Sequence, residues 1–281
     1  MLFPENIGSH LSIDEVSLSK GELYTFVTNK QGRGKKSSLI ACIKGTLSRD
    51  ILYVLEKIPL DLRKNVREVT LDMAKNIESA TKLAFPESKL VTDRFHVVKL
   101  ATEALQHIRI KLRWDELDIE NKAILKAKEN GVKYKSTVLS NGDTPKQLLA
   151  RSRYIIAKKK HQWTENQKTR ANLLFKRYPN LEQAYLKTIE FREIYELKNK
   201  MDAKISFENW IEDIHGEKLS TFYTTANTVK ANLENILNFF NNRSTNANAE
   251  SFNAKIKLFR ANLRGVTDTK FFLFRLHKLY A

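Results

Sequence analysis

Residues 66–100 read VREVTLDMAKNIESATKLAFPESKLVTDRFHVVKL, and this stretch decides the expected fold. The runs at 66–72 and 89–93 are predicted as strands, and each ends in an aspartate. Small and apolar residues between them recur at three- and four-residue spacing, which predicts a helix, and a second helix is expected after residue 93. Strands that alternate with helices in this way indicate an α/β fold.

The chain before this stretch is predicted to add three strands and a helix. The strands are expected at 10–18, 22–29 and 37–45, and the short turns between them favour an antiparallel meander. Helical spacing follows at 46–64, where Pro59 is expected to end the helix. The prediction is an α/β fold with a mixed sheet, in which three antiparallel strands precede two strands that alternate with helices.

The second half of the chain has a different character. Strand signals become rare after residue 109, and the clear breaks in the helical periodicity lie at 141–147 and 177–180. We therefore expect three parts: a first part of the α/β core at 8–108, a large all-helical insertion at 109–240, and C-terminal helices completing the core at 241–281.

Charge and composition restrict the class of protein. The 281 residues carry a formal net charge of +17, which predicts a polyanionic partner and nucleic acid first, although a solvated basic surface or a ribosome-associated protein has the same charge. The single cysteine, Cys42, excludes a disulfide framework and a cysteine-type zinc site within the chain. There is no membrane-length apolar run and no signal peptide, so we expect a soluble, cytoplasmic protein with no membrane partner.

Two aspartates stand where an α/β sheet binds ligands. Asp14 lies within the first expected strand, where a charge is costly unless it is paired or functional, and Asp72 ends the fourth. If these strands are neighbours, the two carboxylates approach each other and a hard divalent cation such as Mg²⁺ fits between them. A helix that crosses the sheet with a third carboxylate would complete a site for two metals, and Glu250 is the candidate.

Residues 246–264 are predicted to form a helix with two distinct sides. The apolar side is expected to carry Ala249, Phe252, Ile256, Phe259 and Leu263. The polar side is expected to carry Asn246, Glu250, Asn253, Lys257 and Arg264. One carboxylate flanked by amides and bases is either a functional group or part of an ordinary solvated helix face.

The chain resembles the DDE transposases of bacterial insertion sequences, in particular the ISL-three type with a ribonuclease-H-like catalytic core. The matching pieces are IDEVSLSKGELYTFV (13–27), VTLDMAKNIESATKLAFPESKLVTDRFHVVKL (69–100) and NANAESFNAKIKLFRANLRGV (246–266). Their order and spacing fit the family, and the second and third pieces are the more specific ones. The resemblance extends from about residue 10 to the end of the chain.

The resemblance implies a catalytic role for three acids. Asp14, Asp72 and Glu250 would bind Mg²⁺, for which Mn²⁺ could substitute. It implies metal-dependent cleavage of double-stranded DNA at transposon ends, followed by attack of the freed 3′-hydroxyl on target DNA. Asp93 also ends a strand and is the alternative second acid, although a helix N-cap explains it as well. His96 would either line the site or pack in the first helical turn.

The resemblance also suggests residues that bind DNA. Lys257 and Arg264 would hold the DNA backbone, while Asn246 and Asn253 would orient Glu250 or a phosphate. In the insertion, Lys158, Lys159 and Lys160 lie between Tyr154 and Trp163. This segment either grips DNA by phosphate contacts and stacking or is a solvated basic segment with core aromatics.

One feature of the family is missing from this sequence. Members usually carry an N-terminal zinc-binding and helix-turn-helix region, which leads us to expect a truncated copy or a separately encoded DNA-recognition polypeptide. The family implies a homo-oligomer located at the bacterial nucleoid. Two other hypotheses remain: a non-catalytic DNA-binding remnant, and a ribonuclease-H-like nuclease without strand transfer.

Overall fold

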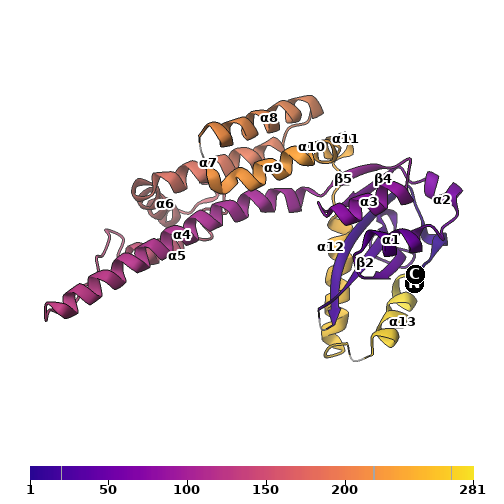
Figure 1. Cartoon of the computed structure of the whole chain (residues 1–281), viewed down its shortest axis with the longest axis horizontal. Helices are drawn as coiled ribbons and strands as arrows, with labels where there is room; N and C mark the ends of the chain where they lie inside the picture. The colour runs from indigo at the N-terminus through magenta and orange to yellow at the C-terminus, as the bar shows by residue number, and fades with distance from the viewer. Residues whose placement is uncertain (20, 218, 267) are drawn as a thin grey trace. The chain divides into compact units, whose positions relative to one another are not determined.

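The structure, a computed structural model, describes residues 1–19, 21–217, 219–266 and 268–281 (Figure 1). It contains two compact units: unit 1 comprises Met1–Val97 and Asn232–Ala281, and unit 2 comprises Val98–Ala231. The expected boundaries lay about ten residues further along the chain, at 108/109 and 240/241. The helix α4 (Arg94–Glu129) continues through the first boundary without a break, so the change in composition comes after the structural division.

Unit 1 is built on a five-stranded mixed sheet with the strand order β3-β2-β1-β4-β5. The neighbours β1, β2 and β3 are antiparallel, whereas β4 pairs parallel to β1 and β5 pairs parallel to β4. The strands are β1 (His10–Ser19), β2 (Glu22–Asn29), β3 (Leu39–Lys44), β4 (Glu68–Leu71) and β5 (Lys89–Thr92). The expected mixed α/β sheet is therefore confirmed. The first strand pairs with the fourth, which was the condition for Asp14 and Asp72 to approach each other.

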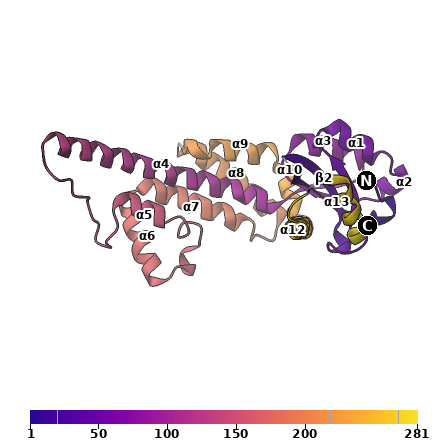
Figure 2. The ribbon, with the colours of Figure 1, turned by 90° about the horizontal axis from the view of Figure 1, so that it is seen from below.

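Helices cover both faces of this sheet (Figure 2). The helices α1 (Ser48–Leu55) and α3 (Lys75–Ala84) pack on one face with Leu11 and Ile13 of β1. On the other face, β1 contributes Val16 and Leu18 to a second core. That core also contains side chains of α12 (Ala247–Asn262) and α13 (Thr269–Tyr280). Since successive strand residues point to opposite faces, Asp14 belongs to the face of α12.

The helix expected at 46–64 is divided at Pro59. The helix α1 ends at Leu55, before Pro59 as expected, but a separate helix α2 (Leu60–Lys64), which was not predicted, follows with Pro59 as its N-cap. Proline lacks an N–H donor and has a fixed φ, so it is well suited to the start of a helix, where that donor has no intrahelical acceptor.

The expected apolar side of residues 246–264 is correct for its first part only. Ala249, Phe252 and Ile256 are buried in unit 1, whereas Leu263 is 41% exposed. The helix ends at Asn262 with Leu263 as C-cap, and Arg264 adopts a φ of 55°. The apolar spacing of the sequence continues past Asn262, but the backbone there is no longer helical, so Leu263 does not point to the same side as Phe252 and Ile256.

The described residues of unit 2 form helices and loops and contain no strand. An aromatic core fills it, with Trp163 packed against Phe175 and Tyr185 and with Phe191 against Trp210. After α4, its helices are α5 (Pro145–Arg151), η3 (Lys160–Gln162), α6 (Glu165–Arg177), α7 (Pro179–Ile194), α8 (Lys200–Gly216), η4 (Ser220–Phe222) and α9 (Tyr223–Ala231).

Short elements complete unit 1. The helices α10 (Leu233–Leu237) and α11 (Phe239–Asn242) precede α12, and α10 lies against β5. Two 3₁₀ turns also belong to unit 1, namely η1 (Pro4–Asn6) and η2 (Lys30–Gly32). The turn η2 follows β2 directly, where a short turn was expected between the second and third strands.

Candidate active site

The register between β1 and β4 sets Asp14 beside Asp72. The parallel ladder pairs Ser12 with Thr70, and Asp14 and Asp72 each lie two residues further along their chains. Residues paired across neighbouring strands point to the same face of a sheet. The two aspartates expected to approach each other are therefore neighbours on the face covered by α12.

A third aspartate extends this row by one strand. The ladder between β4 and β5 pairs Leu71 with Thr92, so the residues that follow, Asp72 and Asp93, are the next pair. The Asp93 N–H donates to the Leu71 carbonyl at 2.9 Å, which continues the ladder to this point. Asp14, Asp72 and Asp93 thus form a row across three neighbouring strands, which we call the aspartate row.

The pKa of the Asp14 carboxyl is shifted by burial and by its neighbours. Burial raises the pKa of Asp14 above its usual value, and the charges of Asp72 and Asp93 raise it further. The Glu15 N–H, which donates to Asp14 Oδ1 at 2.8 Å, and the His96 ring oppose this rise in pKa. Asp72, Asp93 and His96 are therefore each within electrostatic range of Asp14.

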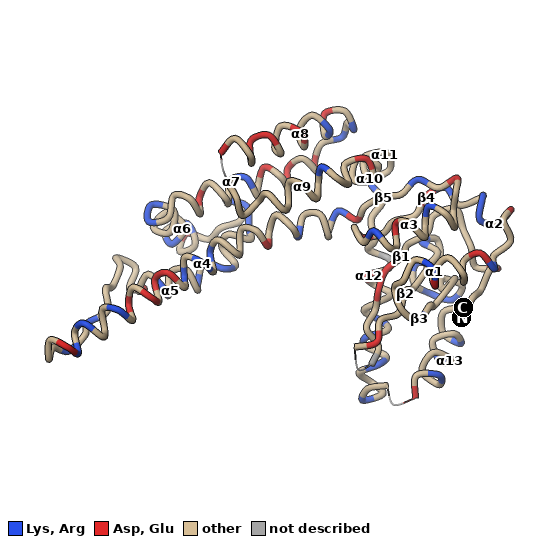
Figure 3. Tube along the Cα trace, in the orientation of Figure 1, with Lys and Arg blue, Asp and Glu red and all other residues tan. Residues whose placement is uncertain are grey.

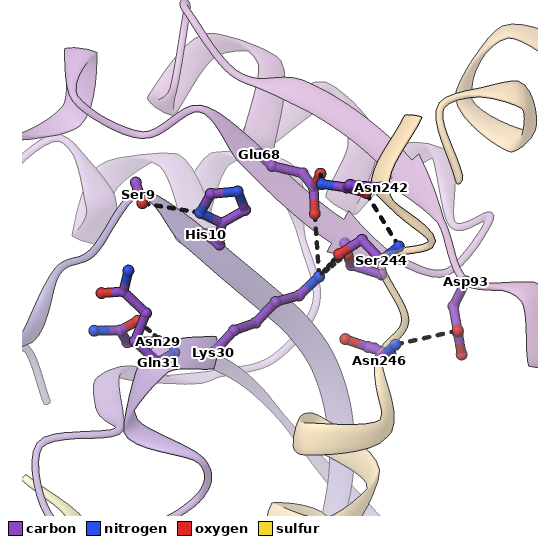
Figure 4. Close-up of polar contacts among 11 residues, drawn as sticks. Ser9, His10, Asn29, Lys30, Gln31, Glu68, Asp93, Asn242, Ser244 and Asn246 are labelled. Carbon is purple, nitrogen blue, oxygen red and sulfur yellow. Dashed lines mark hydrogen bonds and ion pairs between the residues drawn. The ribbon is translucent and has the colours of Figure 1, made fainter. Parts of the chain in front are cut away.

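The helix α12 is attached to the aspartate row at two points. Asn253 Nδ2 donates to Asp14 Oδ2 at 2.5 Å. The Asn246 N–H, just before the helix, donates to Asp93 Oδ1 at 3.2 Å (Figure 4). Glu250 lies one turn before Asn253 and is exposed. Asn253 was predicted to orient Glu250 or a phosphate. In the structure its side chain is hydrogen-bonded to Asp14 instead.

The donor set around the row suits a hard divalent cation. Three buried oxygens have no hydrogen-bond partner in the described part of the chain: Asp93 Oδ2, Asn246 Oδ1 and Asn253 Oδ1. Carboxylate and amide oxygens are the ligands that Mg²⁺ prefers. However, the described residues contain no group of three His, Cys, Asp or Glu side chains arranged to share one ion. Asp14 and Asp72 are brought together, whereas Glu250 does not close around them in this conformation.

Beside the row, a buried lysine connects three segments of unit 1 (Figure 4). Lys30 Nζ, from η2, donates to Glu68 Oε1 at 3.3 Å and also bonds the hydroxyls of Thr70 and Ser244. Asn242 Nδ2 donates to the other Glu68 oxygen at 2.6 Å. We call this group of five residues the lysine bridge, because it joins η2 and β4 to the segment that leads into α12.

The charges of the lysine bridge stabilise each other. Burial opposes ionisation of Glu68, but hydrogen bonds from Ser244 and Asn242 and the charge of Lys30 hold its pKa below the usual value. Burial lowers the pKa of Lys30, and the Glu68 carboxylate opposes that change. The lysine bridge was not predicted from the sequence. The signal available was the alternation of Glu68, Thr70 and Asp72, which places three polar side chains on one face of a strand.

Comparison with known proteins places the chain in a family. A sequence model of the ISL3 type of DDE transposases, described as Transposase, matches residues 11–276. The chain belongs to this transposase family. The resemblance that the three quoted sequence pieces indicated is confirmed.

Two relatives of this transposase-family chain match it at low sequence identity. Two transposases for insertion sequence element IS1557, from the Mycobacterium tuberculosis strains CDC 1551 / Oshkosh and ATCC 25618 / H37Rv, are each 23% identical to it over 251 residues. The match covers 88% of this chain and 54% of each relative, so the chain spans about half the length of these relatives. No solved structure matches the chain.

The basic residues expected to contact DNA differ in exposure. Lys257 and Arg264 are exposed at the C-terminal part of α12 and just beyond it. In unit 2, Lys160 is exposed and Lys158 and Lys159 are half-buried. Lysine and arginine are spread along the whole transposase-family chain, interspersed with acidic residues (Figure 3).

Two of the three lysines expected to bind DNA in unit 2 have acidic partners. Lys159 Nζ lies 3.3 Å from Glu193 Oε1, and Lys160 Nζ lies 4.0 Å from Glu182 Oε1. Trp163 is a core residue whose Nε1 donates to the Ile155 carbonyl at 2.8 Å. Its ring is therefore not a surface for stacking DNA bases. In the described residues no helix is long and apolar enough to cross a membrane.

Proposed function

We propose that unit 1 is the ribonuclease-H-like catalytic core of a DDE transposase that cleaves DNA and transfers strands at insertion-sequence ends. The observation that carries this proposal is the adjacent pair Asp14 and Asp72, on the sheet face covered by α12, in a chain of the transposase family. A parallel strand that ends in an acid beside an acidic central strand is a natural place for a bound cation.

Three carboxylates would hold Mg²⁺, or Mn²⁺ in its place: Asp14, Asp72 and Glu250. The bound ions would supply an activated water or 3′-hydroxyl nucleophile and stabilise the leaving oxygen. Asn253 holds the Asp14 carboxylate in place through its 2.5 Å hydrogen bond. Since Glu250 is one helical turn away on the same helix, a small displacement of α12 would bring its carboxylate towards the pair.

Asp72 is the preferred second acid, and Asp93 has a separate role. Asp72 directly follows β4, the strand next to β1, whereas Asp93 follows β5, one strand further away. Asp93 is 2% exposed and accepts the Asn246 N–H, so it fixes the start of α12. We therefore propose Asp93 as the residue that positions α12, the helix that carries Glu250.

Double-stranded DNA, both the transposon ends and the target, is the proposed substrate. The net charge of +17 supports binding of a polyanion. Lys257 and Arg264 are the proposed backbone contacts in unit 1, and Lys158, Lys159 and Lys160 are those in unit 2. Asn253 positions Asp14 through its side-chain amide, and Asn246 binds Asp93 through its backbone N–H.

The test compares Asp72→Asn with Asp93→Asn in the full chain, using DNA that carries the element's ends. We expect Asp72→Asn to remove Mg²⁺-dependent cleavage, with a rate loss of at least about 1,000-fold, while DNA affinity stays within about threefold. Asp93→Asn should reduce cleavage and leave Mg²⁺ binding detectable by calorimetry. Calorimetry therefore separates loss of the cation from loss of geometry.

The products distinguish the competing functions. Joined target DNA supports transposition, and cleavage without joining supports a ribonuclease-H-like nuclease. A chain that binds DNA but never cleaves it with Mg²⁺ or Mn²⁺ is a non-catalytic DNA-binding remnant. Unchanged cleavage by Asp72→Asn would refute the proposed acids.

A further inference from the structure

One arginine of unit 2 is buried without an acidic partner. Arg109, on α4, is 6% exposed. Its Nε donates to Gln106 Oε1 at 2.7 Å and its Nη1 donates to the Leu149 carbonyl of α5 at 2.9 Å, so both acceptors are neutral. A guanidinium stays charged inside a protein and is costly to bury without an opposite charge. Arg109 is therefore a buried positive charge that no carboxylate in the described part of the chain balances.

Two further arginines add like charge around Arg109. Arg113 lies one helical turn further along α4, and Arg153 lies two residues after the end of α5. Burial lowers the pKa of Arg109, and the positive charges of Arg153 and Arg113 lower it further. We call these three residues the arginine triad. Among the described residues none of the three forms an ion pair with a carboxylate, so their mutual repulsion is not offset.

Buried and half-buried acids close to the triad in sequence are bonded to other bases. Glu116 Oε1 accepts a hydrogen bond from Arg177 Nη2 at 3.0 Å. Asp143, just before α5, is fully buried, accepts from Arg170 Nε at 3.1 Å and also pairs with Arg151. Since these carboxylates already have basic partners, the arginine triad is suited to an anion that the chain itself does not supply.

The triad is held in place before any ligand binds. The side chain of Gln106 joins α4 to the segment after α5, because its Oε1 accepts from Arg109 while its Nε2 donates to the Arg153 carbonyl at 3.2 Å. The same segment is fixed from another helix, where Trp163 Nε1 donates to the Ile155 carbonyl at 2.8 Å. Groups that are already ordered lose little conformational freedom when a ligand binds, which favours binding.

The donors of the triad match a phosphate group. Arg113 Nε is a buried donor with no hydrogen-bond partner in the described residues, which indicates an acceptor from elsewhere. Arg153 is exposed, and its guanidinium lies 5.5 Å from the centroid of the Tyr154 ring, which is itself 69% exposed. Guanidinium groups bind phosphate oxygens through parallel N–H donors. A phosphate also offers more oxygens than a carboxylate does, so it can be shared by three arginines.

From these features we propose that the arginine triad is a phosphate-binding site in unit 2, and that the DNA backbone supplies the phosphate. DNA is taken as the source because of the proposed function, whereas the phosphate chemistry follows from the triad alone. The site is separate from the lysines at 158–160, two of which already have acidic partners. On the sequence alone, the three arginines look like members of an ordinary solvated basic surface.

Thermal unfolding of the full chain tests the phosphate site, with inorganic phosphate replacing chloride at constant ionic strength. The midpoint of the wild type should rise by about 3 °C, because an anion that binds the folded state stabilises it. Arg113→Gln with Arg153→Gln should show less than about half of this rise, which is the general effect of phosphate on folded proteins. Circular dichroism should show that this double variant folds as the wild type does.

The matched control removes the same charge from the opposite side of α4. Lys111 and Lys122 are exposed and lie about 180–220° around the helix from Arg109 and Arg113. Lys111→Gln with Lys122→Gln should therefore keep the full rise in midpoint. An equal rise in the triad variant and in this control overturns the phosphate site.

Fluorescence anisotropy with labelled duplex DNA in EDTA tests the source of the phosphate. The triad double variant should raise the dissociation constant about tenfold or more, and the lysine control should raise it by no more than about threefold. If the two double variants bind DNA equally well while the phosphate effect on unfolding holds, DNA is not the source and a small phosphorylated ligand takes its place. Because both measurements are made without metal and without cleavage, a failure of the proposed catalytic acids leaves them unaffected.

Discussion

At the scale of single residues, Asp14 has an electrostatic conflict that a cation would relieve. It is partly buried, and both Asp72 and Asp93 lie on its side of the sheet. Burial and like charges both penalise its ionised form, and only the Glu15 N–H and His96 act in the opposite direction. A protein without a use for this arrangement would be more stable with a neutral residue here.

Asp14→Asn should therefore stabilise the cation-free protein. Because the folded-state pKa of Asp14 lies above its unfolded value of 3.8, stability falls as the pH rises through that window. At pH 7 in EDTA the variant should unfold a few degrees higher, which corresponds to about 1 kcal/mol. At pH 3 the difference from wild type should vanish.

Thermal unfolding with and without Mg²⁺ completes this experiment. Mg²⁺ should raise the midpoint of the wild type and leave that of Asp14→Asn unchanged, because the variant has lost a ligand. Glu56→Gln, at an exposed acid, is the control and should shift stability by less than about 0.5 kcal/mol. If Asp14→Asn is less stable than wild type at pH 7 in EDTA, burial and the neighbouring carboxylates do not destabilise the ionised Asp14.

At the scale of elements, the lysine bridge determines how α12 meets the sheet. Lys30 and Glu68 are 11% and 8% exposed in their side chains, so their ion pair is shielded from water. Ser244 and Asn242 lie directly before α12 and bond to this pair. The segment that leads to Glu250 is thus attached to η2 and β4 by polar contacts, in addition to the apolar packing of Phe252 on the sheet.

Removing one member of this pair should cost more than removing both charges. Lys30→Met or Glu68→Gln alone should lower the free energy of unfolding by about 3 kcal/mol, since each leaves a buried group without its partner. The double variant should lose less than either single variant, because it leaves no buried charge without a partner. Urea unfolding measures all three variants.

The chain supplies a matched control for this cycle. Lys44 and Glu22 also form an ion pair, at 2.8 Å, but their side chains are 68% and 39% exposed. Lys44→Met and Glu22→Gln should therefore each change stability by less than about 1 kcal/mol and show little coupling. Equal coupling in the two cycles would mean that burial of the lysine bridge has no energetic consequence.

At the scale of the whole molecule, the net charge of +17 predicts DNA binding that weakens steeply with salt. Lys257→Gln with Arg264→Gln should reduce the slope of log affinity against log salt by about 2, one for each lost phosphate contact. Replacing Lys158, Lys159 and Lys160 by Gln should reduce it by less than 3, because Lys159 and Lys160 are already paired with glutamates.

Fluorescence anisotropy with labelled duplex DNA over a range of salt concentrations measures these slopes. Lys133→Gln, an exposed lysine outside the proposed contacts, is the control for a general loss of charge. If this control flattens the slope as much as the variants at Lys257 and Arg264, the DNA contact is not localised to α12. The salt dependence would then report only the net charge.

The sequence by itself determined the order of the strands and helices of unit 1 and the positions of acids at strand ends. These features depend on local periodicity and composition, which act over a few residues. Local patterns missed the separate helix α2 after Pro59 and the end of α12 before Leu263, because a helix boundary also depends on what the neighbouring chain can pack against.

Only the tertiary structure decided which of these residues meet. The aspartate row follows from strand order and register, which are fixed by burying one set of alternating side chains on each face. Asn253 bonds Asp14 across 239 residues of sequence, and Lys30 bonds Ser244 across 214. No local pattern encodes such contacts, because they form only when packing of the whole core brings distant segments together.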